Sequence, residues 1–322
     1  MAKCIMVLVE HFQGTVVDIT YEMLGAGRKI AESLDVPLTA VVFGKDVNKC
    51  LSALGAADSV VLIEDERLEM PGIRIIAEIL KSVFEQKEAS IMLMGGTNIT
   101  AGIGPSLACK LKVPFLNFCK NISVEGGTVT VTSQLFGGKI LSNVNLTNDK
   151  CIISVYPGSF QNEAGKAAKI PPVEEFAVPA IEFEPTFKRY IEPEAGDVDI
   201  TKESVLISVG RGIENSDNIS LADDLVSVLG GAVAASRPVI DQGWLPLSRQ
   251  VGKSGMIVKP KLYFALGISG APEHVEGMKD SELIVAVNKD AAAPIFNVAH
   301  YGICADLQDI VPVLVENLKN KN

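Results

Sequence analysis

The chain has 322 residues, a length that predicts two domains, and its 48% hydrophobic and 21% charged residues are ordinary for a globular protein. The net charge of −10 argues against a nucleic-acid-binding function and disfavours binding to anionic membranes, because no basic stripe is present to neutralise phosphates. The six cysteines form no C-x-x-C pair, which excludes the usual zinc and iron–sulfur spacings and favours free thiols in a reducing cytoplasm. The first apolar run is too short to cross a membrane and carries no cleavage site, so we expect no secretory signal and no membrane insertion.

The first half alternates predicted strands and helices. Short apolar runs bounded by turn residues predict strands at 5–9, 38–43, 59–63 and 91–94, and the segments between them predict helices at 18–34, 46–55 and 72–87. This alternation implies a parallel sheet covered on both faces. The stretch NISVEGGTVTVTSQL then predicts a hairpin around Gly126-Gly127, in an insertion near 121–150, and KCIISVYPG predicts one more strand.

Five prolines between residues 169 and 198 predict an extended linker. The alternation restarts after it, with strands at 204–209, 232–236, 262–267 and 282–287 and helices at 219–229 and 306–318. We therefore expect an α/β protein with two doubly wound parallel-sheet domains, an N-terminal domain at 1–198 and a second domain at 199–322.

Polar turns follow the strands of the second domain. They are Gly210-Arg211-Gly212, Ser236-Arg237, the stretch from Gly267 to His274, and Asn288-Lys289-Asp290. Ligands of doubly wound sheets lie beyond the carboxyl ends of the strands, so these turns are expected to converge on one crevice.

Catalytic motifs are absent from the sequence. VGKSG at 251–255 resembles the end of a phosphate-binding loop, but Leu247 stands where that loop needs glycine. We find no G-x-S-x-G element, no defensible Cys–His pair and no second histidine at metal-ligand spacing. The sequence predicts a ligand-binding protein with no catalytic residue and no metal site.

Five blocks of the second half resemble the FAD-binding half of the electron transfer flavoprotein alpha subunit. They are GRGIENSDN, AASRPVIDQGW, QVGKSGMIVKPKLYFALGISGAPEHVEGM, IVAVNKDAAAPIF and AHYGICADLQDIVPVL. The first half resembles the family more loosely, through GGTNITAGIGPSLACKL and LFGGKILSNV. The resemblance implies that the second domain is a Rossmann-like domain that binds FAD.

The resemblance also implies a role for individual residues. Arg211 and Ser269 would hold the FAD pyrophosphate, because a cation, a hydroxyl and backbone N–H groups suit two phosphates. Arg237, preceded by Ser236, would lie against the isoalloxazine ring and raise its potential; its alternative is a surface ion pair. Ser254 would reach the flavin N5 and His274 would donate to the pyrimidine end of the ring, while Asn288 and Asp306 would serve the adenosine and its ribose. The complete set of expected cofactor-binding residues is Arg211, Ser236, Arg237, Gln250, Val251, Gly252, Lys253, Ser254, Gly267, Ser269, Gly270, Ala271, Pro272, Glu273, His274, Asn288, Asp306 and Leu307.

The function that the resemblance implies is electron transfer without substrate chemistry of its own. The chain would form a heterodimer with a beta subunit and exchange electrons with flavin dehydrogenases such as acyl-CoA dehydrogenase. The sequence leaves open whether the protein is of the electron-bifurcating type. The alternative is a regulatory module that binds adenine nucleotides and has no redox function.

Two positions depart from the family's pattern. Glu273 and Lys253 stand where glutamine is frequent, and their opposite charges allow either a compensating pair, a retuned flavin or two solvated loop charges.

Overall fold

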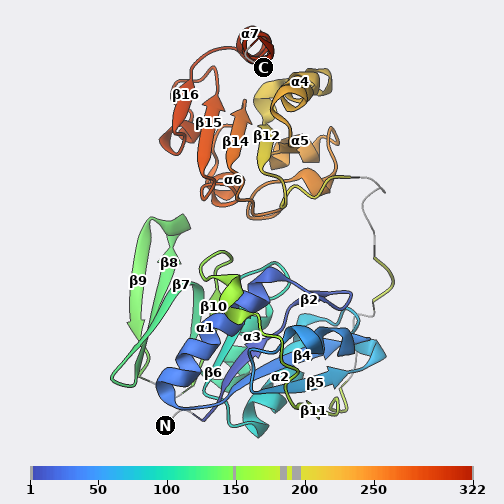
Figure 1. Cartoon of the computed structure of the whole chain (residues 1–322), viewed down its shortest axis with the longest axis vertical. Helices are drawn as coiled ribbons and strands as arrows, with labels where there is room; N and C mark the ends of the chain where they lie inside the picture. The colour runs from blue at the N-terminus through green and yellow to red at the C-terminus, as the bar shows by residue number, and fades with distance from the viewer. Residues whose placement is uncertain (1–2, 148–149, 182–186, 191–196, 321–322) are drawn as a thin grey trace. The chain divides into compact units, whose positions relative to one another are not determined.

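A computed structural model describes residues 3–147, 150–181, 187–190 and 197–320. The chain divides into two compact units between Arg189 and Tyr190 (Figure 1). Residues 182–186 and 191–196 of the predicted linker lie outside the described residues.

The first unit is built on a nine-stranded sheet whose strands are nearly all apolar and buried at its centre. In spatial order they are β11 (Val173–Glu175), β5 (Ser59–Glu64), β4 (Leu38–Gly44), β1 (Ile5–Leu8), β6 (Ile91–Gly95), β10 (Cys151–Val155), β7 (Phe115–Glu125), β8 (Thr128–Leu135) and β9 (Ile140–Asn145). Strands β11 to β7 are parallel to their neighbours, and β8 and β9 join antiparallel. Apolar runs that are buried on both faces are typical of parallel strands.

Helices cover both faces of this sheet. Helix α1 (Asp18–Leu34) packs on the face that carries Ile5 and Val7, and α2 (Ile73–Gln86) and α3 (Ile103–Leu111) pack on the face that carries Met6 and Leu8. The α/β class predicted from the sequence is confirmed. The sheet of this unit is mixed rather than purely parallel because the hairpin strands extend it.

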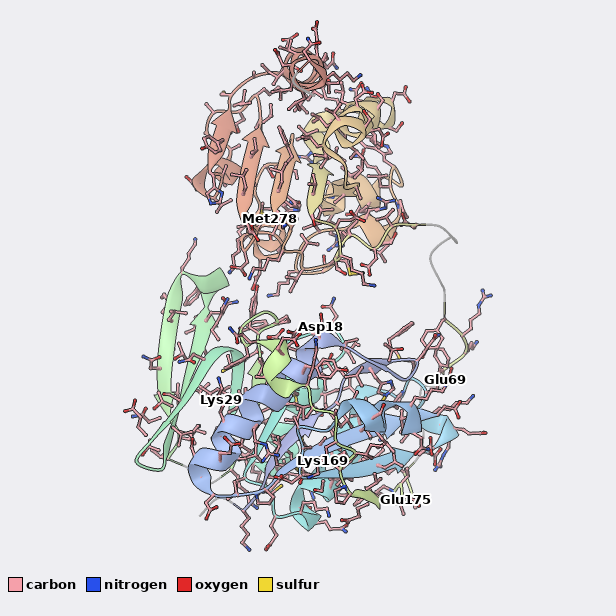
Figure 2. All side chains as sticks on the ribbon, in the orientation of Figure 1. Asp18, Lys29, Glu69, Lys169, Glu175 and Met278 are labelled. Atoms are coloured by element: carbon pink, nitrogen blue, oxygen red, sulfur yellow. The ribbon has the colours of Figure 1, made fainter. Side chains whose placement is uncertain are left out.

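Several details of the first unit differ from the expectation. Helix α3 was not predicted. The predicted helix at 46–55 is a 3₁₀ helix at Val47–Ala53, since only a short connection separates β4 from β5. The hairpin has a third strand, β9. Within the predicted linker, β11 pairs with β5, and Glu175, labelled in Figure 2, is its last residue. A strand of three residues with exposed side chains has no apolar pattern by which the sequence could reveal it.

The second unit is a purely parallel, five-stranded sheet. Its spatial order is β13 (Ala232–Ala235), β12 (Val205–Val209), β14 (Leu262–Leu266), β15 (Leu283–Val287) and β16 (Tyr301–Ile303). Helices α4 (Ser220–Leu229) and α7 (Leu307–Lys319) cover one face. The short helix α6 (Pro272–Glu276) and loop residues, among them Met278 (Figure 2), lie at the other; α5 (Arg237–Asp241) follows β13.

This strand order reverses between β12 and β14 (Figure 1). The chain runs outward from β12 to β13 and then returns to β14 on the other side, which is the flavodoxin-like doubly wound order. Folds of this order bind their ligands at the carboxyl ends of the two strands that flank the point of reversal. The predicted polar turns are therefore expected at this position.

Candidate cofactor site

Two glycine turns meet at the point of reversal. The Gly210 N–H donates to the Leu266 carbonyl (2.8 Å) and the Gly212 N–H donates to the Gly267 carbonyl (3.0 Å). A Cβ atom at Gly210 would collide with the Gly267 carbonyl oxygen, and Gly267 has a φ of +63°. Glycine is required here because the two turns touch backbone to backbone. The two turns therefore pack backbone against backbone at the point of reversal.

A cation and a hydroxyl stand on these turns. Arg211 is exposed and opens a single 3₁₀ turn, Arg211–Ile213, directly after β12. Ser269 is also exposed, and its carbonyl accepts from the Ile295 N–H (3.0 Å), while Gly270 adopts a φ of +85°. A guanidinium and a hydroxyl on turns at adjacent strand ends suit a pyrophosphate chemically.

The loop from Gln250 to Ser254 is fastened at two places. The Val251 N–H donates to the Ala235 carbonyl (2.9 Å) at the end of β13, and the Lys253 N–H donates to the Glu273 carbonyl (2.8 Å) in α6. Within the loop, the Gln250 amide Nε2 donates to the Ser254 hydroxyl (2.9 Å). The loop therefore joins the end of β13 to α6.

Gly252 makes the tight contact of this loop with α6. Its φ is +140°, and a Cβ there would approach the Glu273 carbonyl to 3.0 Å. Glu273 and Lys253, the two positions that depart from the family's pattern, are thus joined by a backbone hydrogen bond. Both side chains are exposed. Ala271 and Pro272, also exposed, begin α6.

Arg237 lies at the carboxyl end of β13. Ser236 is the buried N-cap of α5 and Arg237 is the first residue of that helix. The guanidinium Nε lies 3.4 Å from the Asp241 carboxylate, and the Arg237 side chain is 66% exposed. The ion pair that the sequence analysis held as the alternative is thus present. An exposed i,i+4 pair contributes little, so it leaves the guanidinium free to turn towards a ligand.

His274 is buried in the unit. Its Nε2 lies 2.9 Å from the Tyr263 hydroxyl, and its Nδ1 has no hydrogen-bond partner among the described residues. Burial lowers the pKa of His274 to about 4, and the Val251 carbonyl opposes this shift only in part. The imidazole is therefore neutral near pH 7, when it carries one donor and one acceptor nitrogen.

The last three expected residues have structural contacts of their own. The Asn288 amide donates to the Ile268 carbonyl (2.9 Å) and accepts from the Asp290 N–H (2.9 Å), which braces two neighbouring turns. Asp306 caps α7 by accepting from the Gln308 N–H (3.0 Å), and Leu307 is buried in the core. Their roles towards adenosine stay predictions.

We call the residues that these contacts assemble, 210–212, 236–237, 250–254, 267–274 and 288, the carboxyl-end rim. The strand-end rule placed them from sequence, since turns after parallel strands share one edge of the sheet. Sequence reasoning missed Tyr263 and Ser208, which lie below the rim on β14 and β12. The available signal was a hydroxyl-bearing residue within each of two otherwise apolar, buried strands.

Comparison with known proteins agrees with this geometry. Residues 5–181 match the family model of the electron transfer flavoprotein domain, and residues 199–279 match that of the electron transfer flavoprotein FAD-binding domain. Protein FixB of Clostridium saccharobutylicum is 33% identical over 324 residues, which cover 98% of this chain and 96% of FixB. The electron transfer flavoprotein subunit alpha of Bacillus subtilis is 31% identical and is covered over 99% of its length, with all of this chain aligned.

A third relative carries a different name. The acryloyl-CoA reductase electron transfer subunit beta of Anaerotignum propionicum is 31% identical over 350 residues, covering 98% of this chain and 95% of that protein.

Fold and rim together define the class: an α/β protein whose second unit is a cofactor-binding domain of flavodoxin-like order. The matched models and relatives then narrow it, and the chain belongs to the electron transfer flavoprotein alpha-subunit family. No helix within the described ranges is both long and apolar enough to span a membrane.

Proposed function

We propose that this chain is the FAD-carrying alpha subunit of an electron transfer flavoprotein and works in the cytoplasm. The observation that carries the proposal is the coincidence of two independent results: the FAD-binding family model covers residues 199–279, and the same residues form most of the carboxyl-end rim. FAD supplies one- and two-electron transfer chemistry when it is bound. The family match does not favour the non-redox regulatory module.

The residues of the rim fit FAD. Arg211, Ser269 and the backbone of the glycine turns would bind the pyrophosphate; Arg211, Gly212 and Ser269 are exposed, and Gly212 has no side chain to hinder its approach. The unpartnered Nδ1 of His274 fits an acceptor atom of the flavin ring, because a buried polar atom without a partner costs stability until a ligand satisfies it. Arg237 and Ser254 would contact the ring, and Asn288 and Asp306 the adenosine.

The partners follow from the relatives. We propose a heterodimer with a beta subunit, since the subunit of Bacillus subtilis is named alpha, and electron exchange with an acyl-CoA dehydrogenase or a similar flavoprotein. One relative is named as an electron transfer subunit of acryloyl-CoA reductase, and this name supports a partner that acts on an acyl-CoA.

The test is the spectrum of the purified complex. The chain, co-expressed with an electron transfer flavoprotein beta subunit, is expected to be yellow and to hold FAD in this chain. A complex that is colourless and stays so after FAD is added would contradict the proposal. Unfolding the complex and identifying the released cofactor by chromatography separates FAD from FMN.

The same preparation addresses electron bifurcation. One relative is the LctC subunit of an NAD(+),ferredoxin-dependent lactate dehydrogenase of Acetobacterium woodii, at 30% identity over 97% of this chain. Two FAD per heterodimer with oxidation of NADH would support the bifurcating type. One FAD with bound AMP would exclude it.

A further inference from the structure

A line of buried polar side chains runs beneath the carboxyl-end rim. Ser208 on β12, Tyr263 on β14 and His274 on α6 are all buried. Tyr263 pairs in register with Leu206 and Ser208 pairs with Ala265, so Tyr263 and Ser208 lie on the same face of the sheet, two residues apart. The Tyr263 hydroxyl lies 2.9 Å from His274 Nε2. Neither Tyr263 nor Ser208 belongs to the rim that is expected to touch the cofactor.

The direction of this hydrogen bond follows from the protonation of its two partners. Burial raises the pKa of Tyr263 well above its ordinary value, against a smaller lowering effect of the Ser208 hydroxyl, so the phenol keeps its proton. A neutral imidazole has one protonated and one unprotonated nitrogen. The buried Tyr263 O–H group needs a hydrogen-bond acceptor, because an unsatisfied buried donor is costly. His274 Nε2, at 2.9 Å, is in position to accept this hydrogen bond. The Tyr263 O–H therefore donates to Nε2, and the imidazole proton lies on Nδ1.

We propose that Tyr263 is a positioning residue that holds His274 as the Nδ1–H tautomer, so that this N–H is available to a hydrogen-bond acceptor of the FAD ring. The identity of the ligand rests on the proposed function, whereas the tautomer rests on the contacts of this chain alone. Without Tyr263, only the nearby Val251 carbonyl, which forms no regular hydrogen bond with the ring, would favour a proton on Nδ1. A neutral His274 could then also place its proton on Nε2, and in that tautomer Nδ1 would face the same acceptor with a lone pair. A single hydroxyl below the site would thus decide whether His274 attracts or repels that atom.

The other two histidines provide an internal reference. His11 accepts at Nδ1 from the Gly14 N–H (3.4 Å), and its Nε2 lies 2.9 Å from the Phe43 carbonyl, which can only accept. His300 accepts at Nδ1 from the Ile284 N–H (2.9 Å). When neutral, both rings therefore carry their proton on Nε2. Because the chain has only three histidines, His274 is expected to be the one ring of opposite tautomer.

The experiment is ¹⁵N NMR of the imidazole rings in the full chain, labelled at histidine and paired with its unlabelled partner subunit, at neutral pH. The expected spectrum shows Nδ1 protonated in His274 and Nε2 protonated in His11 and His300. In Tyr263→Phe the His274 signals are expected to shift towards the Nε2–H or an averaged tautomer, with the other rings unchanged. Tyr301→Phe, which removes an exposed hydroxyl from β16 of the same unit, is the matched control and is expected to change none of them.

FAD then links the tautomer to the ligand. Adding FAD to the flavin-free wild type is expected to shift the His274 Nδ1–H signal and leave His11 and His300 in place. The flavin absorption spectrum of Tyr263→Phe is expected to differ from the wild type, and that of Tyr301→Phe is expected to match it.

The outcomes separate the two proposals. His274 with its proton on Nε2 in the wild type, or a Tyr263→Phe spectrum identical to the wild type, overturns the role of Tyr263 even in a chain that takes up FAD. A chain that never takes up FAD overturns the proposed function and the ligand named here. If Tyr263→Phe does not fold, the wild-type tautomer alone decides the role of Tyr263.

Discussion

Single side chains at the rim are expected to act through charge and through close packing. Arg237 is the residue that we expect to influence the bound flavin most, because it is a permanent cation at the end of β13. Its ion pair with Asp241 is exposed and weak, so a bound flavin that becomes negative on reduction can compete for it.

Arg237→Ala is expected to keep the fold and much of the FAD, and to lower the potential of the first electron by roughly 60–120 mV, the scale of one charge-assisted contact of about 1.4–2.8 kcal/mol. The potential of Arg237→Lys should lie between those of the wild type and Arg237→Ala, since lysine keeps the charge but loses the planar guanidinium. Potentiometric titration of the complex measures the shift. If Arg237→Ala has the same potential as the wild type, Arg237 does not lie beside the flavin ring and the expected position of the flavin is wrong.

A substitution at Gly210 can test the backbone contact between the turns that follow β12 and β14. Gly210→Ala is expected to force the β12 and β14 turns apart, at a cost of about 1–3 kcal/mol in the free energy of unfolding, and to weaken FAD binding as well. The control is Gly230→Ala, the C-cap of α4, where a Cβ meets no atom but φ is +75°. Gly230→Ala should lower the free energy of unfolding by about 1–3 kcal/mol, because its backbone conformation (φ +75°, ψ −174°) is essentially restricted to glycine. Loss of FAD affinity in both variants, or in neither, would contradict the assignment of the turns to the cofactor site.

Elements were predictable where burial leaves a pattern in the sequence. The apolar runs of β1, β4, β5 and β6 and the helical spacing of α2 predicted each element within a residue or two at its ends. Strand β11 was not predictable, because it is held by backbone pairing at an edge of the sheet and not by side-chain burial. The rim turns followed from the strand-end rule, but the contact between Tyr263 and His274 depends on how α6 packs on the sheet, which no local pattern records.

A partly buried ion pair joins the start of the second unit to the cofactor loop. Asp197 accepts from the Ser248 hydroxyl and the Arg249 guanidinium, and Arg249 also donates to the Val233 carbonyl (2.8 Å). Burial acts to raise the pKa of Asp197, but the hydrogen bonds from Ser248 and Arg249 outweigh it and hold the pKa below its ordinary 3.8. Since Arg249 directly precedes Gln250, this contact supports the loop from Gln250 to Ser254.

Asp197→Asn is therefore expected to lower the free energy of unfolding of the second unit by about 1–3 kcal/mol near pH 6. A depressed carboxyl pKa stabilises the fold above the ordinary pKa of 3.8, and this stabilisation is lost as the pH falls from there through the folded-state pKa, so the difference should shrink below pH 3.8 and vanish once Asp197 is protonated in the folded state. Denaturant unfolding followed by fluorescence reports on this unit, because the single tryptophan, Trp244, lies in it. Asp223→Asn on exposed α4 is the control; equal midpoints for wild type and Asp197→Asn at pH 6 would refute the role of the pair.

On the scale of the whole molecule, both units are of the α/β class, but they differ in the polar groups that follow their strands. The second unit presents glycine backbone, a cation and an unpartnered imidazole nitrogen at its point of strand reversal. In the first unit, β1 is followed by Glu10, whose buried carboxyl accepts from the Thr97 hydroxyl (2.8 Å) and Thr100 hydroxyl (3.4 Å) after β6. The polar groups that follow β1 and β6 in the first unit are therefore hydrogen-bonded to each other. For this reason we assign the cofactor to the second unit.

The most direct measurement of that assignment is the affinity of the complex for FAD when the pyrophosphate contacts are removed. Titration of the flavin-free complex is expected to give a dissociation constant about 10–100-fold higher for Arg211→Ala than for the wild type, the loss of a charge-assisted contact of about 1.5–3 kcal/mol. Arg67→Ala, which removes an exposed cation from the first unit, should bind FAD as the wild type does. Unchanged affinity in Arg211→Ala, or an equal loss in Arg67→Ala, would contradict the assignment of FAD to the carboxyl-end rim.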